Sequence, residues 1–480
     1  MVPSAAPQLD RRAFLAAAAG FGAALALPVL PAHAVLRDDT DALEQAIANA
    51  ADGVVRLPAG VLRVRRTLTI DRPVSIVGAG IGRTVIRHAG AGRPRNTLVI
   101  SAPGVEMRDL TIEAEAARQH SGVYGLLVRA PRFTGERVQV RGNGGVILSR
   151  SAGSAWRSSP SPVWVYRSPR CVIEDCAVTG SRRNRMLALV SHGSRGTVVR
   201  GNSFANRVDA DYTAPAIDVA HSAGCVIEGN VIAGSNWHGI RATSAPGIQV
   251  RDNEVRRPGR LRADGGPTVS AILLDRAAGS RVERNRTFDT GGYGIAVCRS
   301  RATAASPVVV TENSVDGCED PGITVQASEH VAVTRNAVHS ATWGFTVGEA
   351  DRPCRSVHVT DNEFSACPWA GGFVQGSDRC SVRRNTFVDC GDRDDVKRRP
   401  DALVVLFDGG GRGTTLSRVE LNTATQTPEA AALGRRLPAL FVRSDPGNPY
   451  PGPRSARNVV AGNAIVPPQP SSSRSLRSAR

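Results

Sequence analysis

The densest group of acidic residues in the sequence lies in the stretch NRVDADYTAPAIDV, which contains Asp209, Asp211 and Asp218. Two carboxylates can serve as general acid and water activator in glycoside hydrolysis. Acids that hold Ca²⁺, with an arginine beside them, would instead suit a lyase that neutralises a uronate and removes its C5 proton. A structural alternative stands beside both, because short acidic side chains such as Asp209 and Asp211 also form turns.

A second stretch, NWHGIRA, supplies a base, an arginine and an aromatic ring. We take these groups together with the acids as one candidate site for a carbohydrate. The predicted catalytic residues are Asp218, Arg241, His238, Asp209 and Asp211. The predicted sugar-stacking residues are Trp237, Tyr212, Tyr293 and Trp343. The structural alternatives are a surface ion pair between Asp218 and Arg241, and aromatic rings that only shield a turn from solvent.

The elements that position these side chains follow from an internal repeat. The segments CVIEGNVI and IQVRDNEV place Asn230 and Asn253 in matching positions 23 residues apart, and later copies follow at intervals of 23 to 32 residues. The repeated asparagines are Asn202, Asn230, Asn253, Asn285, Asn313, Asn336, Asn362 and Asn385, and Asn463 in NVVAGNAI is a last, separated copy. A fixed period of this length is typical of a solenoid.

The pattern within each lap predicts short β-strands. Apolar residues alternate with polar ones around each asparagine, as in a half-buried strand. We expect three strands per lap, each pairing with its copy in the next lap. Asparagine tolerates the left-handed backbone of a tight turn, and its amide can bond to the asparagines above and below. The sequence therefore predicts one buried asparagine ladder.

A second apolar piece in each lap predicts which side chains leave the coil. If Ile217, Ile240 and Ile272 point inward, the residue after each points outward, because side chains alternate along a strand. Asp218 and Arg241 should then be neighbours on adjacent laps of one outer face.

The N-terminal part of the mature chain predicts a cap. DDTDALEQAI predicts a helix from residue 38 to 47 with Leu43, Ala46 and Ile47 on one face, and VVRLPAGVLRV and VSIVGAG follow as strands and turns. Together these segments resemble the cap of the pectate-lyase-like right-handed parallel β-helix proteins. The resemblance implies an all-β, single-stranded right-handed parallel β-helix with an N-terminal capping helix, whose substrates lie on the outer face of the strands that follow the third turn. The chain lacks the catalytic motifs of the polygalacturonase-type hydrolases and mannuronan epimerases, so no catalytic residue transfers by motif.

The first 34 residues resemble a twin-arginine export signal. RRAFL begins at Arg11, an alanine-rich apolar run follows, and AHA ends at Ala34 as a cleavage site. We expect an exported protein, periplasmic or secreted, without a transmembrane span in its mature part. The predicted divisions are a signal peptide (1–34), a cap with the first laps (35–115), the β-helix (116–466) and a disordered tail (467–480).

The composition favours an anionic partner. The formal net charge is +17, yet the arginines are dispersed without a basic block among aromatics, so we do not expect nucleic acid. An acidic polysaccharide or cell-envelope glycan is the expected partner of an exported chain. Dispersed arginine also occurs as an ordinary solvated surface, which is the alternative.

All nine cysteines lie in the predicted mature part, and no C-x-x-C pair suggests a zinc or redox site. Cys367 and Cys390 each follow a ladder asparagine by five residues. Equivalent positions in adjacent laps lie about 4.8 Å apart, within the range of about 4.4–6.8 Å that a disulfide needs. We therefore predict a Cys367–Cys390 disulfide.

Two functions remain from the sequence. The clustered acids favour a polysaccharide lyase or glycoside hydrolase that acts on an acidic polysaccharide, with Ca²⁺ as a candidate cofactor. The missing motifs favour a non-catalytic β-helix that binds glycan or another envelope component.

Overall fold

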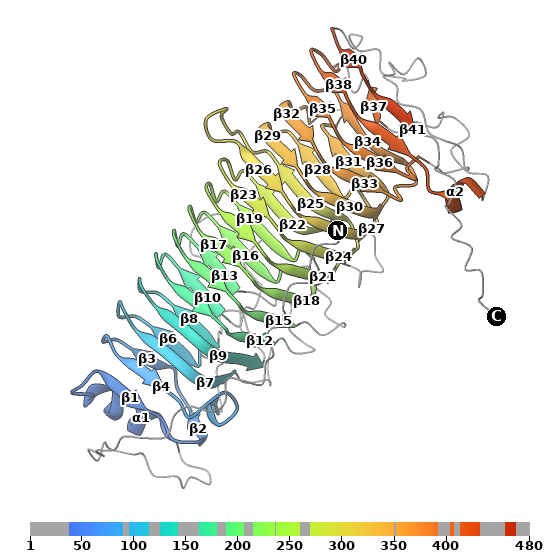
Figure 1. Ribbon diagram of the computed structural model, residues 1–480. Helices are drawn as coiled ribbons and strands as arrows, with labels where there is room; N and C mark the ends of the chain where they lie inside the picture. Colours follow the sequence, from blue (N-terminus) through green and yellow to red (C-terminus); the bar gives the residue numbers. More distant parts are fainter. Residues whose placement is uncertain are drawn as a thin grey trace, which may run out of the picture.

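The chain coils into a long stack of short parallel strands, which begins at helix α1 and ends at β40 and β41 (Figure 1). The computed structural model describes residues 38–89, 96–114, 125–142, 163–179, 189–205, 215–235, 237–259, 269–349, 352–391, 404–407, 413–432 and 457–466. Strands pair in parallel with the equivalent strands of the next lap, as β16 with β19, β17 with β20 and β18 with β21. The predicted fold class, an all-β right-handed parallel β-helix, is confirmed.

One sheet, sheet B, contains the strand that opens each lap. Its strands are β3 (Leu68–Ile70), β6 (Leu98–Ile100), β8 (Leu126–Val128), β10 (Val163–Tyr166), β13 (Leu189–His192), β16 (Ile217–Ala220), β19 (Ile240–Thr243), β22 (Ser270–Asp275), β25 (Tyr293–Cys298), β28 (Ile323–Gln326), β31 (Trp343–Val347), β34 (Ala370–Gln375) and β37 (Val404–Phe407).

The other sheet, sheet A, bends at the asparagine position and so has two limbs. Its first limb contains β1 (Val54–Arg56), β4 (Ser75–Val77), β11 (Val172–Glu174), β14 (Val198–Arg200), β17 (Val226–Glu228), β20 (Gln249–Arg251), β23 (Arg281–Glu283), β26 (Val308–Thr311), β29 (Glu329–Thr334), β32 (Arg355–Thr360), β35 (Ser381–Arg383), β38 (Arg418–Glu420) and β40 (Val459–Ala461). Its second limb contains β2 (Gly60–Val64), β5 (Thr84–His88), β12 (Ala177–Thr179), β15 (Ser203–Ala205), β18 (Val231–Ser235), β21 (Glu254–Pro258), β24 (Arg286–Thr290), β27 (Ser314–Cys318), β30 (Ala337–Ala341), β33 (Glu363–Ser365), β36 (Thr386–Val388), β39 (Thr423–Thr425) and β41 (Ala464–Val466). The longer strands β7 (Glu106–Ala114) and β9 (Thr134–Gly142) run through both limbs.

Helix α1 (Thr40–Ala48) covers the first laps. Leu43 and Ile47 are buried in the common core, and Ala46 packs against it. The N-cap residue Asp39 makes no side-chain cap to the helix; its carboxylate accepts from the backbone N–H of Arg63 at 2.8 Å. The cap therefore ties the helix to β2 while its apolar face closes the end of the core. A second short helix, α2 (Pro428–Ala432), follows β39.

The asparagines stack in one continuous row at the bend of sheet A. The side-chain amide N–H of Asn230 donates to Oδ1 of Asn253 at 2.9 Å, and so does its backbone N–H at 3.0 Å. The row begins at Asn202 and extends beyond Asn385 to Asn422 and Asn463. Asn422 was missing from the predicted set. The backbone prediction was wrong by one position, because the left-handed residue precedes each asparagine, as Gly229 and Asp252 do.

Serine hydroxyls form a similar, shorter row at the turn after sheet B, which the sequence analysis did not predict. The backbone N–H of Ser168 donates to Oγ of Ser194, and that of Ser194 to Oγ of Ser222. The pattern returns later, where the N–H of Ser300 donates to Oγ of Ser328. These bonds satisfy buried backbone donors that no strand partner reaches.

The glycine that precedes many sheet B strands is required by packing. A Cβ on Gly294 would lie 2.4 Å from Cγ1 of Val315, and one on Gly322 would lie 2.3 Å from Cγ1 of Val338. Both valines belong to the second limb of sheet A and fill the core. The recurrent GI dipeptide therefore marks where the entering strand passes closest to the core of its own lap.

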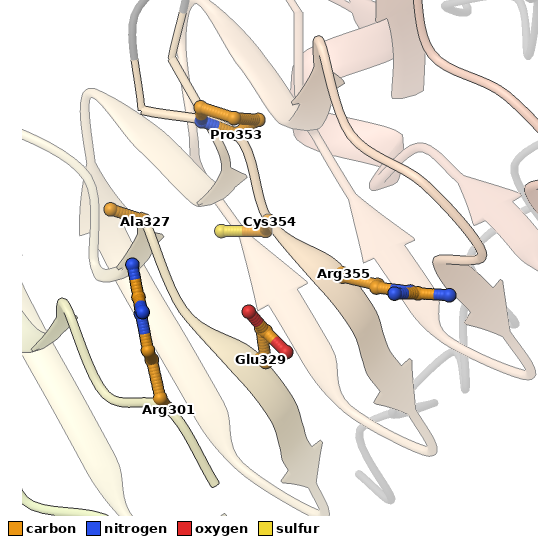
Figure 2. Close-up of a pocket in the computed structure, with 6 residues that line it drawn as sticks. All are labelled: Arg301, Ala327, Glu329, Pro353, Cys354 and Arg355. Atoms are coloured by element: carbon orange, nitrogen blue, oxygen red, sulfur yellow. The ribbon is translucent and has the colours of Figure 1, made fainter.

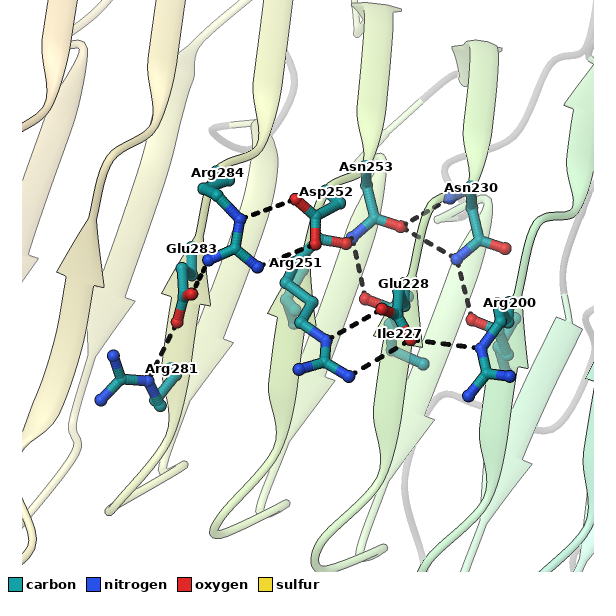
Figure 3. A network of polar contacts seen from close by, with 12 residues as sticks. Arg200, Ile227, Glu228, Asn230, Arg251, Asp252, Asn253, Arg281, Glu283 and Arg284 are labelled. Carbon is teal, nitrogen blue, oxygen red and sulfur yellow. Dashed lines mark hydrogen bonds and ion pairs between the residues drawn. The ribbon is translucent and has the colours of Figure 1, made fainter. Parts of the chain in front are cut away.

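Many arginines are neutralised along the bend of sheet A, next to the asparagine row (Figure 3). Glu228 lies between Arg200 and Arg251, at 3.2 Å from each guanidinium. At the next position of the lap, directly before the asparagine, Arg284 donates two hydrogen bonds of 2.8 and 3.0 Å to the carboxylate of Asp252. Pairs of the same kind continue at Arg335–Glu312 and Arg384–Asp361. Arginines and acids that alternate from lap to lap leave little excess charge on this edge.

The nine cysteines are all free thiols in this structure. Cys367 and Cys390 occupy equivalent positions in adjacent laps, since β33 pairs with β36 just before them. Their side chains interact, and the hydrogen bond that the Cys367 thiol makes to Cys390, together with burial, raises the pKa of Cys367. The register that we predicted is present, but the predicted disulfide is not formed here.

The described residues contain no helix that is long and apolar enough to cross a membrane. The predicted signal peptide and tail lie outside the described residues.

Candidate functional site on the outer face of sheet B

Adjacent laps bring Asp218 and Arg241 together, as the repeat predicted. Ile217 pairs with Ile240 in register, and Asp218 pairs with Arg241. The isoleucines are buried in the common core, so the two charged side chains leave the opposite face of sheet B.

Asp218 and Arg241 form a closed, buried ion pair. Nε and Nη2 of Arg241 donate to the two carboxylate oxygens of Asp218 at 2.9 and 2.6 Å. Each side chain is only 5% exposed, and the indole of Trp237 lies over the guanidinium at 4.9 Å. Asp218 and Arg241 therefore lie on the predicted outer face, but they are not accessible there as a catalytic pair. The ion pair of the structural alternative is present, although it is buried and not on the surface.

His238 is also buried, beside the ion pair. Its Nδ1 accepts the backbone N–H of Ser270 at 3.0 Å, and its ring lies 4.2 Å from that of Trp237. Burial, and then the charge of Arg241, holds the pKa of His238 well below its usual value. The ring is therefore neutral and fixed at one nitrogen, which is the geometry of a structural histidine.

The remaining predicted residues divide into two groups. Asp209, Asp211 and Tyr212 lie outside the described residues. Tyr293 and Trp343 occupy the same position in their laps as His238, where β22 pairs Ser270 with Tyr293 and β31 pairs Trp343 with Ala370. Both rings are partly exposed, so the accessible part of the outer face lies further along the coil than the predicted acid cluster.

Trp343 belongs to a cluster of rings that we call the aromatic patch, formed by Trp343, Trp369 and Phe373. The ring of Trp343 lies 5.5 Å from that of Trp369 and 4.9 Å from that of Phe373. Trp369 is 36% exposed, which is high for a tryptophan. Sequence reasoning missed Trp369 and Phe373, although the segment PWAGGF contains both beside a glycine like that of the other laps.

A group of polar side chains, the polar strip, adjoins these rings: Tyr293, Thr324, Gln326, Thr346, Glu349 and Arg352. Within it, Gln326 is the centre. Its amide N–H groups donate to Glu349 and lie 3.5 Å from the Tyr293 hydroxyl, and its carbonyl accepts from Arg352 at 3.0 Å. The hydroxyls of Thr324 and Thr346 bond to each other at 2.7 Å.

Two acids influence Tyr293. Burial raises the pKa of Tyr293, and the charges of Glu349 and Asp320 add to the rise. Burial, and then the charge of Glu319, raises the pKa of Asp320 above its usual value. Asp320 precedes β28 and Glu349 follows β31, so these two carboxylates belong to opposite ends of the strands of sheet B.

Among the described residues, no group of three or more His, Cys, Asp or Glu side chains is placed to hold a metal ion.

Comparison with known proteins agrees with the fold. The family model described as "Right handed beta helix region" matches residues 210–352 and 298–387. No curated protein matches the sequence.

Solved structures of similar shape belong to proteins of different kinds. The A-module of mannuronan C-5 epimerase AlgE6 from Azotobacter vinelandii is 18% identical, with 90% of this chain and 97% of that chain covered and a TM-score of 0.44. The pre-mature gene product 12 of bacteriophage phi29 is 12% identical, with 90% and 65% covered and a TM-score of 0.46. The surface protein and adhesin PfbA of Streptococcus pneumoniae is 11% identical, with 73% and 94% covered and a TM-score of 0.43. At such values the likeness concerns the fold alone. What the family model and the coordinates establish together is that residues 210–387 are a right-handed β-helix region.

Proposed function

We propose that the protein is an exported carbohydrate-active β-helix protein that binds an acidic polysaccharide along the outer face of sheet B, over β25, β28, β31 and β34. The observation that carries the proposal is the aromatic patch beside the polar strip. A sugar ring has apolar C–H faces and a rim of hydroxyls, so it suits a surface on which exposed rings adjoin hydrogen-bonding groups. Thr324, Gln326 and Thr346 are buried, so the accessible groups of the polar strip are those of Tyr293, Glu349 and Arg352.

The polar strip runs from lap to lap, which suits a linear polymer that lies along the coil. Tyr293, Gln326 and Glu349 lie on three successive laps and contact each other through Gln326. Consecutive laps are about 4.8 Å apart, so a chain of sugars that lies along the coil can contact side chains from several laps.

The acidic nature of the polymer is supported by charge. The described residues contain 34 arginines and 31 acidic residues, so the total of +17 does not locate the charge, and the support is local. Arg352 in the polar strip is exposed and also lies 3.6 Å from Glu349, so a uronate carboxylate would share its guanidinium with that acid.

Binding is tested by replacing single rings of the aromatic patch. Trp343→Ala and Trp369→Ala should each weaken binding of a polyuronate about tenfold, because a stacked ring contributes about 0.5–1.5 kcal/mol beyond its buried area. The matched control is Phe288→Ala, which removes a partly exposed ring of sheet A that stacks on Arg256 and Arg286. Equal affinities in all three variants and the unaltered protein, measured by titration calorimetry, would exclude this face.

Catalysis is a second candidate, which the raised pKa of Asp320 favours. In hydrolysis a protonated Asp320 would donate its proton to the leaving oxygen. Unsaturated ends that absorb at 235 nm would identify a lyase, and new reducing ends alone a hydrolase. Asp320→Asn should abolish product formation while polymer binding persists.

The pH dependence of the reaction rate tests whether Asp320 acts as the general acid. A rate that depends on protonated Asp320 falls as pH rises through the raised pKa of that group. Binding without any product from uronate or neutral polymers would leave the non-catalytic alternative as the function.

A further inference from the structure

A hollow lined by arginines lies at the turn after sheet B, in the same laps as the polar strip. It consists of two adjoining depressions of about 400 and 480 Å³ that share Arg301 and Ala327. We call it the basic hollow. Nine residues line it: four arginines (Arg276, Arg299, Arg301 and Arg355), one acid (Glu329) and four uncharged residues.

Two of the arginines are held in place by a buried acid. Asp275 is 4% exposed, and its carboxylate oxygens accept from Nε and Nη2 of Arg299 at 2.7 and 2.8 Å. Nη2 of Arg276 donates to the same carboxylate at 3.3 Å. Both arginine side chains are more than half exposed, so the guanidinium groups are fixed at one end and open to solvent.

Arg301 has no ion-pair partner within the described ranges. Its neighbours Ser300 and Ala302 are both buried, and the N–H of Ser300 donates to Oγ of Ser328 at 3.1 Å. The backbone of Arg301 also bridges to Glu329 in the next lap. A fixed backbone therefore presents an exposed cation at the edge of the hollow.

Figure 2 shows how the charged side chains of the hollow are placed. Arg301 extends alongside Ala327, and Glu329 lies between Arg301 and Arg355, which extends away from it. Arg355 is 3.7 Å from Asp378, so its charge is partly matched. The positive charge that remains for a ligand is thus concentrated on the side of Arg276, Arg299 and Arg301.

We propose that the basic hollow binds an oxyanion through these three guanidinium groups. The planar N–H fork of arginine matches carboxylate, sulfate and phosphate oxygens. Gln326 of the polar strip pairs in register with Cys298, which directly precedes Arg299, so a sugar chain that lies along the polar strip passes beside the hollow. If the proposed function holds, the oxyanion is an acid group of the bound polysaccharide, and the hollow selects acidic over neutral polymers.

The test compares Arg301→Ala with Arg301→Lys and with Arg195→Ala. Arg195 is exposed on the equivalent turn between β13 and β14, several laps away, and supplies the same charge change outside the hollow. Affinity for a polyuronate is measured by calorimetry, and binding of inorganic sulfate by the thermal shift it gives over sodium chloride of equal ionic strength. Circular dichroism checks that each variant is folded.

We expect Arg301→Ala to weaken polyuronate binding about fivefold and to abolish the sulfate-specific shift, since exposed charge pairs contribute up to about that factor. Arg301→Lys should recover part of the loss, and Arg195→Ala should match the unaltered protein. Unchanged sulfate and polymer binding in Arg301→Ala, or an equal loss in Arg195→Ala, would overturn the proposal. A sulfate shift that depends on Arg301 in a protein that binds no polysaccharide would support the hollow and contradict the proposed function.

Discussion

At the scale of single residues, the main result is that the predicted acid and arginine meet but are not accessible. Pairing Asp218 with Arg241 follows from the repeat, because register alone fixes which residues lie side by side. Their burial does not follow from the repeat, and the indole of Trp237, which lies over the Arg241 guanidinium, has no counterpart that the repeat could reveal. Sequence reasoning therefore gave the right neighbours and the wrong environment.

The buried pair should matter for stability. Asp218→Asn or Arg241→Ala leaves one charge without its partner, so each should lower the free energy of unfolding by about 3–5 kcal/mol. The double variant Asp218→Leu with Arg241→Met removes both charges and should recover most of the loss. Urea unfolding of the three variants measures this, and a double variant less stable than either single one would contradict it.

His238 predicts a pH effect with a definite sign. Its pKa in the folded state is well below its usual value of 6.5, so the unfolded chain binds the proton more readily. Stability should therefore fall as pH drops below about 6.5 and continue to fall toward the lowered pKa. In His238→Asn the amide oxygen can still accept the Ser270 N–H, and the pH slope should be smaller. Identical slopes of unfolding free energy against pH in both proteins would exclude this role.

At the scale of elements, the asparagine row was predictable because the same residue type recurs with flanking valines. The serine row and the missing Asn422 were harder to see, since alanine or cysteine interrupts the serines and long insertions flank the last laps. Trp369 and Phe373 were missed for a related reason. Their contact with Trp343 exists only once adjacent laps are aligned.

The asparagine row should contribute most in its interior. Asn313→Ala removes the acceptor of two buried donors of Asn285, so we expect a loss of at least about 2 kcal/mol. The control Asn463→Ala lies at the end of the row and is partly exposed, so it should cost less than about 1 kcal/mol. Equal losses on chemical denaturation would show that the row is not a continuous stabilising unit.

Cys367 and Cys390 predict a redox difference between compartments. In an oxidising compartment the pair should close, and a crosslink across one 23-residue lap should add about 3 kcal/mol. Thiol titration of the unfolded, exported protein should then find seven thiols. The reduced Cys367→Ser/Cys390→Ser variant, which lacks both cysteines, should give the same number. Nine titratable thiols in the exported protein would contradict the prediction.

At the scale of the whole molecule, charge is distributed unequally around the coil. Acids and arginines alternate along the bend of sheet A, while the basic hollow and Arg352 lie at the edge of sheet B. The total charge of +17 predicted an anionic partner, but only the register of the laps shows which face has arginines available for one. We therefore expect the polymer on the outer face of sheet B and away from the bend of sheet A.

Hydrogen exchange with and without an acidic oligosaccharide tests this placement most directly. With saturating polyuronate oligomer, the account predicts slower exchange in peptides from β25, β28, β31 and β34 and from the turn at residues 299–306. Peptides that contain Asn230, Asn253 and the charged rows of the bend should be unchanged. Protection at the bend of sheet A, or no protection in those four strands while the oligomer is bound, would contradict the account.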